Sequence, residues 1–506
     1  MAEKYDLIIV GAGMAGGILA ARIAERGVNP RTGEKLRVAL MDMGPYFKGD
    51  PRPGYGIPVR RQAWTNLPGD DLESYRAIYS TPWGTAAGIG GQSLHWAAQS
   101  RFPFPEDHEG WMSETGVDWS YDKMTDARTE LTEMFHITPE PEEFLGPGSF
   151  LFRDAATKMG YTVNRFPSSK LNCIWCGQCY DHGCKYDAKS GSLVRYIPIA
   201  ERNGVEIMPH SIVEKVIIQK KGATATATGV VFTQAGKTQE ARADNVIVSC
   251  NITGTPILLL RSGYGPKELV KGELIVENPN IGRNLNGYYT VEVDAVFDTP
   301  VRRSDFGWYT GFYFVDKNPQ GYLNFEMFDR FGRHGEYPSE WAVDEFAPAF
   351  GREHKEFMKK WYHWGSVVGK VTRAAKFWSG KLDSSGREIR QPYHPEIMKR
   401  AQRVREVARD VLVQMGAKKI SDTSKPLPAE GTGATVGSCR GGSDPKSSVV
   451  NSDFECHDVQ NLFIVDACVV PSVPSAHNGG TGTAFMACHA WRRIVAKHFS
   501  RSTGTA

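Results

Sequence analysis

The chain has 506 residues, which is too long for a single hydrophobic core and predicts two or more domains. Its 60 Lys and Arg residues nearly balance 57 Asp and Glu, and the resulting charge of +3 argues against a nucleic-acid partner. No apolar run reaches the ~18 residues of a membrane span, and a strand pattern already begins at Tyr5, where a signal peptide would lie. We therefore expect no membrane span, and a protein that is cytoplasmic, or periplasmic by co-export with a signal-bearing partner.

The first predicted element is an apolar strand over residues 7–10 that runs into a glycine-rich turn. Three glycines follow at G-x-G-x-x-G spacing, Gly11, Gly13 and Gly16. They permit a tight turn, close approach of a pyrophosphate, and close packing of the following helix, whose N-terminal N–H groups favour phosphate. A second strand over 36–41 ends on Asp42, placed to accept hydrogen bonds from a ribose. This order of strand, glycines, helix, strand and acid predicts dinucleotide binding.

A second glycine-rich segment, TPWGTAAGIGGQSLHWAAQSRF, occupies residues 81–102. Glycines in such a loop let the backbone approach an aromatic ring system closely. The candidate site residues of this loop are Gly90, Gly91, Ser93, His95 and Trp96.

Four cysteines follow at C-x2-C-x2-C-x4-C spacing, Cys173, Cys176, Cys179 and Cys184. Thiolates this close together suit an iron–sulfur cluster or zinc, and Lys185 and Lys189 nearby would ease thiolate formation. The ferredoxin-like early spacing favours the iron–sulfur cluster. Plain or disulfide-bonded cysteines are the alternative, and the other five cysteines are scattered and form no disulfide framework.

The second half of the chain alternates between strand-like and helical patterns. Residues 205–232 and 243–251 alternate as a small antiparallel meander that returns to the parallel sheet would, and an amphipathic helix is predicted over 394–415, ended by Gly416. The final segment reads as a buried strand, a loop and a helix. Five tryptophans lie between the predicted meander and the predicted helix over 394–415: Trp308, Trp341, Trp361, Trp364 and Trp378. Aromatic rings can stack on the flat C–H faces of sugars, although ordinary core packing explains most of them.

Several motifs together resemble one family. The N-terminal glycine motif is followed in order by GIGGQSLHW, VIVSCNITGTPILLLRSG, GSCRGGSDP and NLFIVDACVVP. This series, which spans residues 5–495, resembles the glucose–methanol–choline (GMC) flavoprotein oxidoreductases. The segment CIWCGQCYDHGCKYDAKSGS narrows the resemblance to bacterial sugar and sugar-acid dehydrogenases of the gluconate 2-dehydrogenase large-subunit type, and GGQSLHW is also similar to pyranose oxidase.

The resemblance implies an α/β fold with FAD as its cofactor. A discontinuous Rossmann-type FAD-binding domain would comprise residues 1–110, 190–295 and 437–506. An α+β substrate domain with a large antiparallel sheet, together with the cysteine-rich loop, would comprise residues 111–189 and 296–436.

The resemblance also assigns roles around the flavin. It implies that the loop of Gly90 and Gly91 contacts the isoalloxazine, and that His95 is bonded covalently to the flavin, as in pyranose oxidase, or packs at its edge. Asp466 and Ala467 correspond to a segment that lines the ribityl chain and pyrophosphate. A buried carboxylate near phosphates would repel them, so we expect Asp466 to accept from N–H groups or ribityl hydroxyls.

His477 and Asn478 are the catalytic candidates. Removal of hydride from a C–OH group requires a base for the hydroxyl proton, and histidine suits that task near neutral pH. The family places a His–His or His–Asn pair at the flavin, and His477 falls on the second position of that pair. Ala434 stands where the family has its first histidine, which is a departure from the pattern.

These inferences predict an FAD-dependent dehydrogenase that oxidises a secondary or anomeric alcohol of a sugar, glycoside or sugar acid by hydride transfer to flavin N5. Electrons would leave through the cysteine cluster to a cytochrome partner, or directly to a quinone or dye, and a small export subunit is a second expected partner. Three alternatives stay open: an oxidase that uses O2 on the same substrates, a redox-neutral lyase, and an electron-relay subunit.

Overall fold

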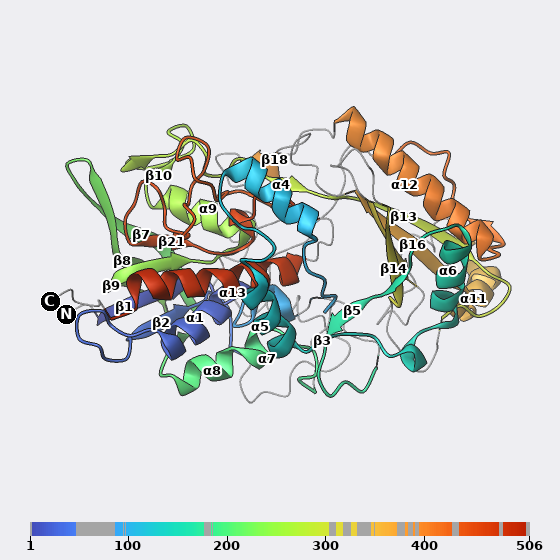
Figure 1. Cartoon of the computed structure of the whole chain (residues 1–506), viewed down its shortest axis with the longest axis horizontal. Coiled ribbons are helices and arrows are strands. Elements are labelled where there is room, and N and C mark those ends of the chain that lie inside the picture. The colour runs from blue at the N-terminus through green and yellow to red at the C-terminus, as the bar shows by residue number, and fades with distance from the viewer. Residues whose placement is uncertain are drawn as a thin grey trace.

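The computed structural model describes most of the chain and places it in two bodies, side by side along the long axis (Figure 1). The described residues are 3–46, 87–94, 96, 98–176, 184, 186–302, 310–316, 325–330, 346–348, 350–371, 380–382, 388–389, 394–427, 435–474 and 479–501. Each body is built on one large sheet with its own hydrophobic core.

The first sheet has seven strands and is parallel at its centre. Its order is β6 (Glu206–Met208), β2 (Val38–Met41), β1 (Glu3–Val10), β9 (Lys237–Val248), β8 (Thr224–Gln234) and β7 (Ser211–Lys221), with β21 (Leu462–Ile464) also paired to β9. Strands β6, β2, β1, β9 and β21 pair in parallel, whereas β7, β8 and β9 form an antiparallel meander. The central strands are apolar runs because both faces of the sheet are covered.

Helices α1 (Met14–Arg26) and α13 (Gly479–His498) pack against each other over this sheet, so the two ends of the chain share one core (Figure 1). The helices α5 (Thr125–Phe135), α7 (Ser192–Arg195), α8 (Ile197–Arg202) and α9 (Asn251–Arg261) complete the layer structure. This arrangement brings residues far apart in sequence to the glycine-rich turn between β1 and α1.

The second sheet is antiparallel, in the order β19 (Lys419–Ile420), β13 (Tyr289–Val296), β16 (Trp364–Val371), β15 (Phe325–Arg330), β14 (Phe312–Asp316) and β4 (Asn164–Arg165). The long helices α12 (Pro395–Gln414) and α6 (Pro147–Lys158) cover its outer face (Figure 1). Alternate residues such as Val291 and Val293 pack with Val404 and Val411 of α12, the period-two pattern of a strand with one face on a core.

The remaining elements are short. They are α4 (Pro105–Thr115), α11 (Gly351–Lys359), β3 (Ile137–Pro139), β5 (Pro167–Ser169), β10 (Tyr264–Gly265), β11 (Val276–Glu277), β12 (Asn286–Gly287), β17 (Lys381–Leu382), β18 (Glu388–Ile389), β20 (Thr435–Val436), and the 3-10 turns η1 (Gly91–Leu94), η2 (Glu142–Phe144), η3 (Trp361–His363) and η5 (Ala467–Val469).

The predicted fold class and the long helix of residues 394–415 are confirmed, and the cores differ from the predicted division at two places. Strand β13 pairs with β16 and belongs to the second sheet, although 289–295 were predicted in the first domain. Trp111, Trp119 and Phe135 lie in the first core, although 111–189 were predicted in the second. The reason is that core membership is decided by long-range packing. Within the described residues no helix is long and apolar enough to cross a membrane.

Candidate functional site

The turn between β1 and α1 needs glycine at two of its three motif positions. Gly11 has φ +94°, and a Cβ there would lie 2.2 Å from the carbonyl oxygen of Ser249. A Cβ at Gly16 would lie 1.8 Å from the carbonyl oxygen of Gly11, so only glycine lets the helix pack this close to the turn. These contacts give the first and third glycines the packing roles that the motif predicts.

Gly13, between them, faces open space. A Cβ there would meet nothing closer than the Cα of Gly91, at 4.0 Å. Gly13 is the N-cap of α1, which has no side-chain cap and no acidic residue in its first turn. Such a helix start presents unshared N–H groups and a favourable dipole, which suit an anion such as a diphosphate.

Asp42 holds the backbone around this turn. Its side chain is buried, and its Oδ2 accepts a hydrogen bond from the Ala12 N–H at 2.9 Å. Its Oδ1 accepts from the N–H groups of Gly44 and Gly88, each at 2.9 Å. Burial raises the pKa of this carboxyl, and the three backbone hydrogen bonds oppose that rise. The structure thus gives Asp42 a positioning role that its sequence spacing did not reveal, and its contact with a ribose stays a prediction.

The glycine-rich loop packs directly on the dinucleotide turn. The Gly90 N–H donates to the carbonyl of Ala12 at 2.8 Å. A Cβ at Gly91, where φ is +51°, would lie 2.7 Å from the Cα of Gly13. The Ser93 hydroxyl donates to the Gly90 carbonyl at 2.6 Å and so closes the loop on itself. The two glycine motifs, some 80 residues apart in the chain, therefore form one surface.

Trp96 joins this loop to the start of the last helix. Its ring packs edge-on against Phe135 with centroids 6.1 Å apart. A Cβ at Gly480, in the first turn of α13, would lie 2.6 Å from the Trp96 ring. The catalytic candidates His477 and Asn478 immediately precede α13 in the chain, but both lie outside the described residues, as do His95 and Ala434.

Asp466 organises a second turn beside the first. It is buried, and its Oδ1 accepts from the Cys468 N–H at 2.6 Å. Its Oδ2 accepts from the Asn251 N–H at 3.0 Å and from the Thr255 hydroxyl at 2.6 Å. Burial raises its pKa, and these hydrogen bonds oppose the rise. Asp466 therefore accepts hydrogen bonds from backbone N–H groups, one of the two kinds of partner that the sequence suggested. Contact of Asp466 or Ala467 with a cofactor stays a prediction.

The structure shows a role of Lys189 that sequence reasoning missed. Its buried ammonium donates to the carbonyls of Leu94 and Trp96, at 3.0 Å each, and its expected effect on the thiolates stays a prediction. No local pattern marks it, because its partners lie more than 90 residues earlier in the chain.

The cysteine segment is described in part. Cys173, Cys176 and Cys184 are free thiols of intermediate exposure, and Cys179 lies outside the described residues. Burial raises the pKa of the Cys173 thiol, and the nearby Lys170 ammonium opposes that rise. In the part of the chain that the structure describes, no group of three or more metal-binding side chains is placed to hold an ion. The iron–sulfur cluster stays a prediction.

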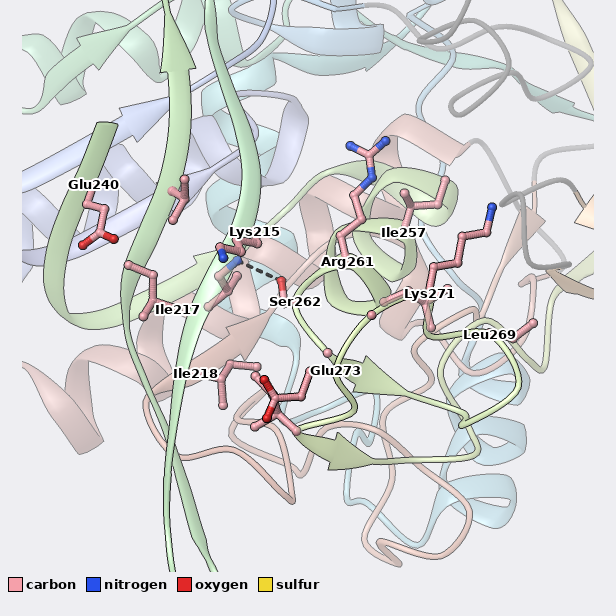
Figure 2. A pocket seen from close by; sticks show the side chains of 16 residues that line it. Lys215, Ile217, Ile218, Glu240, Ile257, Arg261, Ser262, Leu269, Lys271 and Glu273 are labelled. Atoms are coloured by element: carbon pink, nitrogen blue, oxygen red, sulfur yellow. Dashed lines mark hydrogen bonds between the residues drawn. The ribbon is translucent and has the colours of Figure 1, made fainter. Parts of the chain in front are cut away.

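A cavity of about 530 Å³ lies elsewhere, between the β7–β8 meander and the C-terminal end of α9 (Figure 2). Its floor is apolar, with Ile257 and Leu260 of α9, and its rim carries exposed charged side chains of both signs, including Arg261 and Glu273. It contains none of the predicted site residues, and Asp466 contacts the opposite end of α9. The cavity is therefore separate from the candidate site.

Comparison with known proteins identifies the family. Residues 5–290 match the model of the N-terminal part of the GMC oxidoreductases, and residues 382–485 match that of the C-terminal part. The chain belongs to the GMC oxidoreductase family.

Its relatives are distant and differ in substrate. The chain is 24% identical to a 2-methyl-1,2-propanediol dehydrogenase of Mycolicibacterium austroafricanum, over 92% of this chain and 90% of that protein. It is 25% identical to the long-chain-alcohol oxidase FAO4B of Arabidopsis thaliana, over 56% of this chain and only 36% of that protein. It is 27% identical to an oxygen-dependent choline dehydrogenase of Pseudomonas fluorescens, over 60% of this chain and 55% of that protein.

Solved structures share the whole fold. Pyridoxine 4-oxidase from Mesorbium loti superposes with a TM-score of 0.71 at 18% identity, over 97% of this chain and 99% of that one. A formate oxidase superposes with a TM-score of 0.72 at 15% identity, over 98% of this chain and 99% of that one. These likenesses confirm the GMC fold, while the narrower likeness to sugar dehydrogenases stays a prediction.

FAD is the cofactor that this family implies, and the described residues fit it. The open space at Gly13 and the uncapped start of α1 suit the diphosphate. The loop of Gly90 and Gly91 offers backbone without side chains next to that turn, which suits a flat ring system.

Proposed function

We propose that this protein is an FAD-dependent oxidoreductase that oxidises the C–OH group of a small-molecule alcohol. The observation that carries the proposal is the convergence of three segments. The turn at Gly13, the loop at Gly91 and the first turn of α13 at Gly480 meet through direct packing, with Trp96 between the last two. In the sequence, His477 and Asn478 come immediately before Gly479, the first residue of α13, and on this basis we assign them to the flavin site.

Each group of residues has a distinct task in this proposal. The N–H groups at the start of α1 bind the diphosphate, and Asp42 and Asp466 hold the backbone turns on which the cofactor lies. His477 takes the proton of the substrate hydroxyl, and Asn478 helps to hold the substrate oxygen. FAD, when bound, supplies the two-electron acceptor for the hydride.

We further propose a polyhydroxylated substrate, namely a sugar, a glycoside or a sugar acid. The face of the second sheet opposite α12 supports this substrate class, because its strands carry buried polar side chains between the valines of the core. They include Asp294 on β13 and Ser366 and Lys370 on β16. A polar wall of this kind suits a ligand rich in hydroxyl groups better than an aliphatic alcohol.

The test is an anaerobic screen of sugars, glycosides, sugar acids and simple alcohols, monitored by flavin absorbance. We expect the flavin to be bleached by members of the first three classes and not by simple alcohols. Bleaching by simple alcohols alone would retain the oxidation chemistry and reject the substrate class. Bound FAD that no alcohol bleaches would overturn the proposal in favour of a redox-neutral reaction or an electron-relay subunit.

Two further measurements address the acceptor and the cofactor. Dye reduction without peroxide release would identify a dehydrogenase, and peroxide release an oxidase. Iron in anaerobically purified protein would support the predicted cluster at Cys173, Cys176, Cys179 and Cys184, through which electrons would pass to a cytochrome. Yellow colour that stays with acid-precipitated protein would support covalent attachment at His95.

A further inference from the structure

The two chain segments that bracket the cysteines pair with each other to form a stem. We call residues 167–171 and 186–190 the stem. Lys170 and Lys189 face each other in an antiparallel bridge. The Leu171 N–H donates to the Ala188 carbonyl at 2.9 Å, and the Ser190 N–H donates to the Ser169 carbonyl at 3.0 Å. The stem is therefore held by backbone hydrogen bonds and gives its side chains a defined position.

The last two residues of the stem, Lys189 and Ser190, form hydrogen bonds with one end of the glycine-rich loop. The ammonium of Lys189 donates to the carbonyls of Leu94 and Trp96, at 3.0 Å each, and these residues flank position 95 in the sequence. In return, the Trp96 indole N–H donates to the Ser190 carbonyl at 3.1 Å. Hydrogen bonds from a charged donor are stronger than neutral ones, and Lys189 is only 4% exposed, so water competes little with them.

The other end of the same loop is fixed to the dinucleotide turn. The Gly90 N–H donates to the Ala12 carbonyl at 2.8 Å, and the Gly88 N–H donates to Asp42 Oδ1 at 2.9 Å. Between the two attachments the loop has little room, since a Cβ at Gly191 would lie 2.7 Å from the Ser93 hydroxyl. The loop is thus attached to the dinucleotide turn at one end and to the stem at the other.

We propose that Lys189 is a positioning residue that sets the conformation of the flavin-facing loop from the side of the cysteine segment. The inference rests on the proposed function only in taking FAD as the group that this loop faces. A buried ammonium satisfies two carbonyls at once, on both sides of position 95. A neutral side chain would remove this donor from both carbonyls, and the hydrogen bond from the Trp96 indole to Ser190 would then be the remaining one described here between the stem and this end of the loop.

The experiment compares Lys189→Met with Lys170→Met as a matched control. Lys170 is also buried and lies on the opposite strand of the stem, but it pairs with Glu140 at 2.5 Å and lies 4.2 Å over the Trp175 ring. Both variants remove a buried charge from the same stem, so a general loss of stability affects both. A defect of the loop is expected in Lys189→Met alone.

Two readouts need no substrate. Hydrogen exchange in peptides covering residues 88–94 of the FAD-free protein should be about tenfold faster in Lys189→Met than in Lys170→Met. Titration with FAD should show about tenfold weaker binding and altered flavin absorption bands in Lys189→Met. Lys189→Arg, which keeps the charge, should recover part of the affinity. Exchange and FAD affinity equal to those of Lys170→Met would overturn the proposal.

A third variant keeps the test decisive if Lys189→Met does not fold. Lys189→Gln keeps a polar side chain but removes the charge and shortens its reach toward the two carbonyls, so it should accelerate exchange in the same peptides to a smaller extent. Wild-type exchange in Lys189→Gln would then overturn the proposal. Because exchange is measured without FAD or alcohol, failure of the proposed oxidation would leave this result interpretable.

Discussion

Acid sensitivity of the first body should depend on His489. This histidine lies on α13, is 8% exposed, and packs edge-on against Phe454 with centroids 6.2 Å apart. Burial lowers the pKa of His489 from 6.5 to about 4, and the charges of Arg493 and Arg492 contribute in the same direction. Below pH 6.5 the unfolded chain binds a proton at this histidine that the folded protein does not bind. Stability is therefore lost as the pH falls from about 6.5 to about 4.

The size of the effect follows from this shift. A difference of about 2.5 pKa units corresponds to about 3.4 kcal/mol when the pH has passed below both values. Between pH 7.5 and pH 5 the loss is about 2 kcal/mol, because the folded state is still almost unprotonated at pH 5. His489→Gln removes the titrating group and should make the free energy of unfolding about 2 kcal/mol less dependent on pH over that interval.

The assay is urea unfolding of wild type and variant at several pH values between 7.5 and 5, followed by tryptophan fluorescence. Carboxylates that titrate in the same interval affect both proteins equally and cancel in the difference. His136→Asn is the matched control, since His136 is exposed at the end of α5 and its backbone φ of +51° suits asparagine. Parallel stability curves for wild type and His489→Gln would refute the reasoning.

Three further predictions concern the turn, the core and the base. Gly13→Ala should fold, because its Cβ would meet nothing closer than 4.0 Å, but it should bind FAD at least about tenfold more weakly in a titration. Gly11→Ala should instead disrupt the turn itself, and circular dichroism would show the loss of structure. Glu130→Gln should lower the free energy of unfolding by about 3 kcal/mol in urea, because this buried carboxylate accepts from Arg22 at 2.6 Å and Arg492 at 2.7 Å; a loss below about 1 kcal/mol would contradict its role. His477→Ala should slow anaerobic flavin reduction by roughly 10²–10⁴-fold with FAD still bound, and an unchanged rate would remove His477 from the mechanism.

The sequence alone determined the local elements of the site. The strand, the glycines and the start of α1 follow from patterns within about 20 residues, because backbone conformation and close helix packing restrict which residues fit there. The same holds for α12, whose apolar residues recur with the period of a helix and whose end falls at a glycine with φ +85°. The family resemblance supplied the domain scheme and the cofactor, which local patterns do not contain.

Tertiary structure decided which distant residues support those elements. Asp42 stands where a ribose ligand is expected, yet its carboxylate is also engaged with N–H groups of Ala12, Gly44 and Gly88. Lys189 belongs by sequence to the cysteine segment, and folding turns its ammonium to the carbonyls of Leu94 and Trp96. Buried charges and carbonyls need hydrogen-bond partners, and the whole fold decides which distant groups supply them. A periodic pattern along the chain therefore does not reveal these partners.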